Sequence, residues 1–291
     1  MILYLSGLHG MKRHFDYVLS FKDDRLGVLV SYAECPSSKK SSKRPKKNAV
    51  ELMCEAGFTN IMLDSGAFSV ETRGLVLDID SYADFVKDVR SMVRVACSLD
   101  VRGDHESSVK NWNYLRDVRG VDVMPCYHLG EPLEVLDYYC KSTDYVALGG
   151  IAGKSFNWKT VVPTMEKVFS RQPGVRYHIF GVNSPATCMK FPFYSSDSTT
   201  WLIGARLGRV IDPNGAAWQI SPNSASALDY STLDASGMLA WLEKQGITFP
   251  LPEDFSFYRL NEINIRSLYE LLVLKHGEKK FHTLITNQGL W

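Results

Sequence analysis

The chain has 291 residues, of which 45% are hydrophobic and 22% charged, and its formal net charge is +1. This ordinary balance excludes a disordered, fibrous or wholly polybasic protein. No run approaches the roughly 20 consecutive apolar residues of a membrane span, and no basic segment precedes the short apolar run at the amino terminus. We therefore expect a soluble, cytoplasmic protein without a membrane partner.

Eight short apolar runs recur along the chain, bounded mostly by Gly, Pro, Ser or Asp, as is typical of buried strands. The predicted strands cover residues 2–6, 27–32, 60–64, 94–100, 121–127, 145–149, 175–182 and 192–197. The segments between them have helical length and spacing. The predicted helices cover residues 80–93, 107–117, 132–140 and 160–171.

This alternation predicts an α/β fold with a parallel sheet and crossover helices. Eight such units, in a chain slightly longer than the typical length of about 250 residues, favour a closed (β/α)8 TIM-type barrel. Amphipathic segments at 238–245 and 263–275 predict helices in a C-terminal extension that covers about 226–291. We expect one domain over 1–291, with the extension packed on the outside of the barrel.

One segment concentrates the positive charge. Residues 37–47, SSKKSSKRPKK, hold six basic residues and no acid, so the rest of the chain is net acidic. Such a run predicts a mobile loop that is either a solvated linker or an element contacting phosphates. The candidate nucleic-acid contacts are Lys39, Lys40, Lys43, Arg44, Lys46 and Lys47.

Six cysteines are scattered without a CxxC or CxC pair, which favours reduced thiols over disulfides or a zinc knuckle. We predict no metal and no cofactor. Ligands gathered from separate strands, for example Cys97, Cys126 and His128, remain an alternative that local spacing does not address.

Polar residues close several of the predicted strands. Asp64, Asp100 and Asp197 end their runs, His128 follows another, and Gly149 and Gly150 end a further one. The active site of a barrel lies at these carboxyl-terminal ends. A single Asp after a strand is more often the N-cap of the next helix, but carboxylates converging on one rim favour a site.

Two carboxylates facing each other across an anomeric carbon carry out glycosyl transfer with retention, one as nucleophile and the other as acid and then base. Asp64 and Asp197 are candidates for this pair. The glycines that follow Asp64 and Leu148 let backbone groups approach a flat ligand, and Phe68 offers a stacking face.

The motifs DSGAF (64–68), LGGIAG (148–153) and YHIFGV (177–182), followed by Asp197-Ser198, occur in this order at strand ends. Together they resemble the tRNA-guanine transglycosylase superfamily over roughly residues 60–200. The resemblance implies that Asp197 is the nucleophile at C1′ of a guanosine and that Asp64 transfers protons. The substrate-binding residues that it implies are Ser65, Phe68, Asp100, His128, Gly149, Gly150, Ile151 and Phe180. Phe68 and Phe180 would sandwich the purine.

Two departures from the family refine this expectation. No cysteine follows Asp197, so the family's zinc motif is missing. Ser198-Thr199-Thr200-Trp201 also replaces the loop with which the family holds tRNA. The chain looks closest to the short phage-type 7-deazaguanine DNA transglycosylases, for which the host cytoplasm is the expected location.

The expected activity is exchange of guanine in DNA for a 7-deazaguanine base of the preQ0 or preQ1 type, with DNA and the free base as partners. Three alternatives stay open. They are the same chemistry on tRNA, a non-catalytic barrel subunit that binds nucleic acid, and an unrelated hydrolase with a carboxylate pair. His178, in the middle of a predicted strand, is expected to be a hydrogen-bonded residue of the core or behind the site rather than a ligand.

Overall fold

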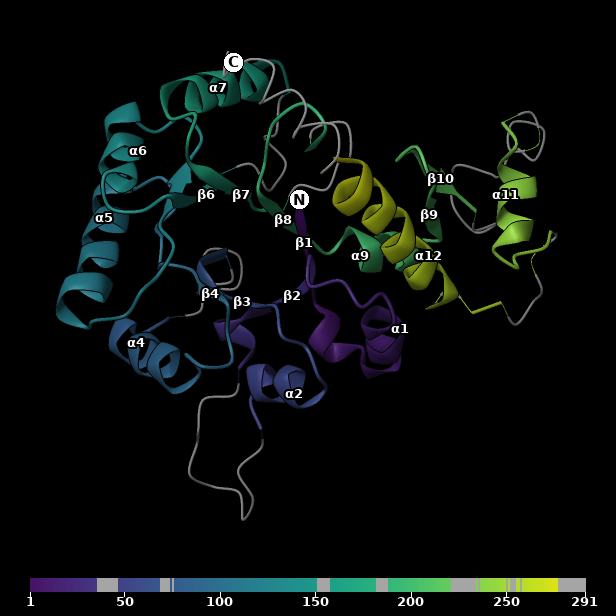
Figure 1. Cartoon of the computed structure of the whole chain (residues 1–291), viewed down its shortest axis with the longest axis horizontal. Coiled ribbons are helices and arrows are strands. Elements are labelled where there is room, and N and C mark those ends of the chain that lie inside the picture. Colours follow the sequence, from purple (N-terminus) through teal and green to yellow (C-terminus); the bar gives the residue numbers. More distant parts are fainter. Residues whose placement is uncertain are drawn as a thin grey trace, which may run out of the picture. The chain divides into compact units, whose positions relative to one another are not determined.

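The computed structural model describes residues 1–35, 47–68, 74, 76–150, 158–181, 188–220, 234, 236–249, 251, 255–256 and 258–276. The chain divides into two compact units, which are described separately (Figure 1). The first comprises Met1–Val182 with Thr187–Ser198, and the second comprises Asn183–Ala186 with Thr199–Trp291. The expectation of a single domain over 1–291 stays a prediction.

The first unit is built on eight parallel strands in the order β4-β3-β2-β1-β8-β7-β6-β5. They are β1 (Ile2–Ser6), β2 (Leu26–Ser31), β3 (Ile61–Asp64), β4 (Val95–Ala96), β5 (Cys126–His128), β6 (Tyr145–Gly149), β7 (Arg176–Ile179) and β8 (Ser195–Ser198). Cys97 and Met124 form a parallel bridge between the two edge strands. The Met124 N–H donates to the Ala96 carbonyl, and the Ser98 N–H donates to the Met124 carbonyl, both at 2.8 Å. This contact closes the ring, so the predicted (β/α)8 fold is confirmed.

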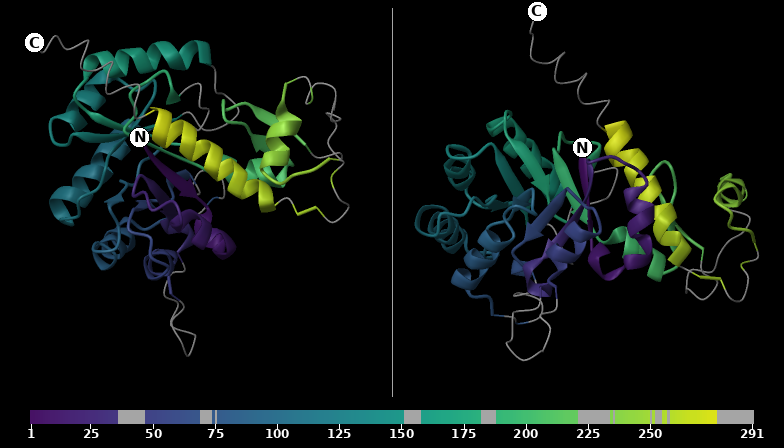
Figure 2. Two further views of the ribbon diagram at one scale, coloured as in Figure 1. Left: turned by 45° about the vertical axis from the view of Figure 1, so that its right-hand side comes forward. Right: turned by 60° about the horizontal axis from the view of Figure 1, so that its bottom comes forward.

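Helices connect successive strands. They are η1 (Leu8–Gly10), η2 (Lys12–His14), α1 (Phe15–Leu19), η3 (Tyr32–Glu34), α2 (Ala49–Glu55), α4 (Ile79–Asp88), α5 (His105–Asn113), its π-helical continuation η4 (Tyr114–Val118), α6 (Leu133–Cys140) and α7 (Trp158–Arg171). Figure 1 shows α4 to α7 in an arc outside the strands, and Figure 2 shows these blue to teal helices from two other sides.

Side-chain caps fix where several helices begin. The Asp78 carboxylate accepts from the Ser81 N–H, and α4 therefore starts at Ile79. Asp104 caps α5 in the same way through the Ser107 N–H. Asn48 and Glu51 form a reciprocal capping box at the start of α2.

Several strands are shorter than their apolar runs. The run over 94–100 forms a strand only at Val95–Ala96, followed by the bridge at Cys97, and the Leu99 carbonyl accepts from the Asn111 side chain at 2.9 Å. In the run over 121–127, the bridge at Met124 is separated from β5 by Pro125, which has no N–H to donate. Carbonyl groups outside the ladder find other partners, such as that of Val123 with the Trp112 indole N–H.

The second unit contains α9 (Thr200–Arg206), the antiparallel pair β9 (Arg209–Ile211) and β10 (Ala217–Gln219), α11 (Met238–Lys244), α12 (Tyr258–Leu268) and its π-helical continuation η5 (Tyr269–Lys275). Buried Asn264 joins these pieces. Its Oδ1 accepts from the Ile211 N–H at 2.8 Å, and its Nδ2 donates to the carbonyls of Arg209 and Trp201. Among the helices described, none is long and apolar enough to cross a membrane.

Candidate functional site

The polar residues at the strand ends lie on one rim of the barrel. Asp64 is the last residue of β3, His128 of β5 and Gly149 of β6. Asp197 lies within β8, and Asp100 follows the short β4. Because all eight strands are parallel and the ring is closed, their carboxyl ends meet at the same mouth.

Two hydrogen bonds hold the Asp197 carboxylate, and a buried histidine lies beside it. The Ser6 hydroxyl donates to Oδ2 at 2.7 Å, and the Gly181 backbone N–H donates to Oδ1 at 2.9 Å. The Nε2 atom of fully buried His178 lies 3.4 Å from Oδ1. Hydrogen bonds to both oxygens fix the orientation of this carboxylate.

His178 belongs to a buried chain of polar side chains that reaches Asp197. Its Nδ1 lies 2.7 Å from the Ser195 hydroxyl, which lies 2.6 Å from the Tyr145 hydroxyl. If Tyr145 donates to Ser195 and Ser195 donates to Nδ1, neutral His178 carries its proton on Nε2, facing Asp197. The reverse order would put the proton on Nδ1, so that the lone pair of Nε2 would face a lone pair of Asp197 Oδ1 in a buried site. The first order is therefore favoured.

The environment of the Asp64 carboxyl group changes its pKa. Burial, together with the negative charges of Asp100 and Asp197, raises the pKa of Asp64 to about 7, although a hydrogen bond from the Gly66 N–H opposes the shift. A carboxyl group with this pKa exists in both protonation states near neutral pH. These electrostatic interactions also place the three carboxylates of the rim near one another.

Asp100 and His128 form a close pair. His128 Nε2 lies 2.7 Å from Asp100 Oδ2, and Nδ1 lies 3.1 Å from Glu131 Oε1. Burial lowers the pKa of His128, but hydrogen bonds with Asp100, Cys126 and Glu131 outweigh it and raise the pKa well above the usual value. His128 is therefore a cation whose charge is shared between two carboxylates.

Glycine is required at two positions on this rim. A Cβ atom on Gly149 would lie 2.7 Å from His128 Cδ2 and 2.8 Å from Cys126 Sγ. Gly66 has a φ of +87°, and its Cβ would lie 2.7 Å from the Ala33 Cβ. The DSGAF and LGG motifs therefore allow close approach between neighbouring segments of the rim.

The structure places the remaining predicted residues as follows. The Ser65 hydroxyl is buried and has no hydrogen-bond partner among the described residues, and Gly150 follows β6 with a φ of +79°. Phe68 is 56% exposed, whereas the half-buried Phe180 ring lies 4.5 Å from the His178 ring. A purine sandwich between the two phenylalanines stays a prediction. Ile151 lies outside the described residues.

Most of the basic run also lies outside the described residues. This applies to Lys39, Lys40, Lys43, Arg44 and Lys46. Exposed Lys47 is described, and its Nζ lies 2.6 Å from Glu55 Oε2. A phosphate at Lys47 would have to compete with this carboxylate.

One group of side chains has the donors of a metal site. The ligand atoms of Asp100, Cys126 and His128 lie within 4.8 Å of one another. Two ligands of a tetrahedral zinc ion, each at about 2.0–2.2 Å, are separated by about 3.3 Å. The 2.7 Å contact between Asp100 and His128 instead fits a direct hydrogen bond, so the described geometry does not fit zinc bound by both.

Sequence reasoning missed Ser6, Gly181 and Ser195, and it expected His178 in the core or behind the site without naming Asp197 as its neighbour. The sequence pattern that could have indicated His178 and Ser195 is the alternation of side chains along a strand, in which every second residue faces the same side. His178 lies two residues before Phe180, and Ser195 two before Asp197, so each shares the inward face of a residue already assigned to the site.

No family model and no curated protein matches the sequence. Among solved structures, tryptophan synthase from M. tuberculosis in an open form is 11% identical, with a TM-score of 0.43, over 93% of this chain and 92% of that chain. A 2,3-dimethylmalate lyase of the PEP mutase/isocitrate lyase superfamily is 12% identical, with a TM-score of 0.41, over 98% and 94% of the two chains. The assignment of the barrel here depends on the strand order and closure of this chain itself.

Proposed function

We propose that this protein is a transglycosylase that exchanges guanine in DNA for a 7-deazaguanine base. The observation that carries the proposal is the pairing of two different carboxyl groups on one rim. Asp197 is held by the donors Ser6 and Gly181, whereas Asp64 has a pKa near 7. Environments that separate two carboxyl groups in this way are typical of a nucleophile and an acid–base partner.

In the first half-reaction, an Asp197 oxygen forms a bond to C1′ of the target nucleotide as the bond from C1′ to guanine N9 breaks. Protonated Asp64 gives its proton to the departing base. In the second half-reaction, ionised Asp64 takes the N9 proton of the incoming 7-deazaguanine, whose N9 bonds to C1′. The ester bond between Asp197 and C1′ breaks as this bond forms, and each residue regains its initial form.

The rest of the rim supports a flat, polar base. Asp100 offers acceptor oxygens of the kind that bind the N1–H and 2-amino edge of guanine, and its orientation is fixed by His128. The unpartnered Ser65 hydroxyl offers a further polar contact. A nucleotide reaches a rim of this kind only after it leaves the duplex stack.

The test is incubation of the full chain with duplex DNA and preQ0 or preQ1, followed by mass spectrometry of the digested nucleosides. The proposal expects a 7-deazaguanine nucleoside in DNA, and a covalent protein–DNA adduct that Asp197→Ala abolishes. Parallel reactions with tRNA separate the two nucleic acids as substrates.

Asp117→Asn is the matched control, because Asp117 is exposed and pairs with Arg116 on an outer helix. This variant should retain wild-type exchange. Exchange in tRNA but not DNA would overturn the assignment to DNA. An adduct that persists in Asp197→Ala would move the nucleophile to another residue, with Asp64 as the first candidate.

A further inference from the structure

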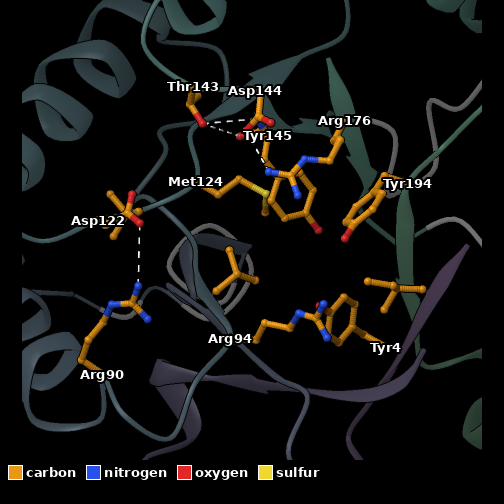
Figure 3. A pocket seen from close by; sticks show the side chains of 13 residues that line it. Tyr4, Arg90, Arg94, Asp122, Met124, Thr143, Asp144, Tyr145, Arg176 and Tyr194 are labelled. Atoms are coloured by element: carbon orange, nitrogen blue, oxygen red, sulfur yellow. Dashed lines mark hydrogen bonds and ion pairs between the residues drawn. The ribbon is translucent and has the colours of Figure 1, made fainter. Parts of the chain in front are cut away.

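A polar cavity of about 260 Å³ lies at the opposite end of the barrel from the candidate site (Figure 3). Its lining includes the residues that begin β1, β4, β6 and β7, namely Ile2, Val95, Tyr145 and Arg176. Met124 and Tyr194, which line it too, come shortly before β5 and β8. It is therefore an amino-terminal mouth, and Tyr145 in its lining begins the polar chain that leads through Ser195 to His178.

Three arginines line this mouth: Arg90, Arg94 and Arg176. Among the described residues, two of them have long ion pairs, since Arg94 Nη1 lies 3.5 Å from Asp24 Oδ2 and Arg90 Nη2 lies 3.8 Å from Asp122 Oδ2. Arg90 Nη1 also donates to the Val93 carbonyl at 3.3 Å. Both carboxylates are largely exposed, at 72% and 91%. A guanidinium group has five N–H donors, so these pairs leave donors for a ligand.

Arg176 is held in place by its surroundings. Its guanidinium lies 5.2 Å from the ring centroid of Tyr145 and 5.1 Å from that of Tyr194, and it pairs with Asp144 at 2.8 Å. Figure 3 shows Arg94 and Arg176 on different sides of the same open space. Guanidinium groups fixed before binding favour an anion, because less side-chain entropy is lost when it binds.

The hydroxyl groups of two lining tyrosines are already engaged. The Tyr4 hydroxyl donates to Asn60 Oδ1 at 3.0 Å, and that of Tyr145 lies 2.6 Å from the Ser195 hydroxyl. The arginines therefore provide the principal hydrogen-bond donors of this cavity, and these donors favour a ligand with acceptor atoms.

The cavity is slightly smaller than the range of about 300–1,000 Å³ that drug-sized ligands occupy. We propose that the amino-terminal mouth binds the phosphate group of a small ligand, with Arg94 and Arg176 as its main contacts. The ligand is either inorganic phosphate or a small phosphorylated molecule. The proposal is independent of the base-exchange activity.

Isothermal titration of the full chain with inorganic phosphate, at constant ionic strength, tests this proposal. A single saturable site is expected, and Arg94→Gln and Arg176→Gln should each weaken binding at least tenfold. Asp144→Asn should tighten it, because Asp144 competes with the ligand for Arg176. The control Arg171→Gln removes an exposed arginine that pairs with Asp137 and is not among the lining residues, so it should bind like the wild type.

A parallel titration with a nucleoside monophosphate separates the two sources of phosphate. Similar affinity for both ligands would indicate recognition of the phosphate alone, and tighter nucleotide binding that still depends on Arg94 would indicate a phosphorylated ligand. The proposal is overturned by an absence of saturable binding to both ligands. It is overturned equally if the arginine variants bind as well as the wild type, or if Asp144→Asn binds more weakly.

Discussion

The Nε2 atom of His178 lies 3.4 Å from Oδ1 of Asp197, and the two residues occupy neighbouring strands, β7 and β8. Ser195 fixes the opposite side of the imidazole. Nε2 faces the carboxylate without a hydrogen-bond partner among the described residues, and we expect His178 to act as a positioning residue for the proposed nucleophile.

Replacing His178 tests this role. His178→Leu should slow formation of the covalent adduct by about tenfold to a hundredfold, because misplacement of the nucleophile reduces the population of reactive geometries. His178→Gln should recover part of the rate, since its amide can donate toward Asp197. Rapid-quench trapping measures the rate, and the affinity for the free base should stay unchanged. Equal losses in both variants would indicate a packing role.

The proposed exchange should depend on pH through Asp64. The first half-reaction needs its protonated form and the second needs its ionised form, so turnover should peak near pH 7, around the pKa of about 7, and fall on both sides. Asp64→Asn should abolish turnover. Measurement of kcat from pH 5 to 9 checks this, and a rate independent of pH in that interval would remove Asp64 from proton transfer.

Asp64 should also reduce stability at neutral pH. Its pKa is about 7 in the folded protein against 3.8 for the unperturbed group, so the folded state binds the proton more tightly. The stabilisation of the folded state by protonated Asp64 is fully present below about pH 3.8, and it is lost as the pH rises to about 7. Asp64→Asn should therefore be more stable than the wild type at pH 8. The difference in free energy of unfolding between variant and wild type should be about 1–3 kcal/mol more favourable to the variant at pH 8 than at pH 4. Urea unfolding at the two pH values measures the difference.

Gly149 should not tolerate a methyl group. The Cβ of Gly149→Ala would lie 2.7 Å from His128 Cδ2, which should cost about 1–3 kcal/mol and displace the His128 ring from Asp100. Gly174→Ala is the control, because its Cβ would meet nothing within 4 Å. Thermal unfolding compares the two variants. A Gly149→Ala protein as stable as the control would contradict the close packing at this rim.

The basic run should act through phosphates. Replacing all six basic residues of 37–47 with Ser should weaken DNA binding and flatten its salt dependence by roughly 0.7–0.9 of a log–log unit per lost contact. Glu55→Gln removes the described partner of Lys47 and should strengthen binding slightly. Fluorescence anisotropy at several salt concentrations measures both effects. An unchanged slope in the six-fold variant would identify the run as a solvated linker.

Local sequence was sufficient for the barrel, because each strand is a short apolar run bounded by turn-forming residues. The predicted bounds of β1 and β6 agree with the structure, at Ile2–Ser6 and Tyr145–Gly149. The parallel order of the strands then required polar strand ends to share a rim. The sequence alone therefore indicates Asp64, Asp197 and His128 as residues of this rim.

The tertiary structure alone decided the electrostatic state of that rim. The raised pKa of Asp64 depends on burial and on charges contributed by β8 and by the segment after β4, neither of which is local to β3. The contact of His178 with Asp197 depends on the register in which Ser195 lies opposite His178. The arginine-lined mouth likewise combines segments separated by about a hundred residues. Distances of this kind arise only when the ring closes, because each one is set by side chains that different strands bring to the same end of the barrel.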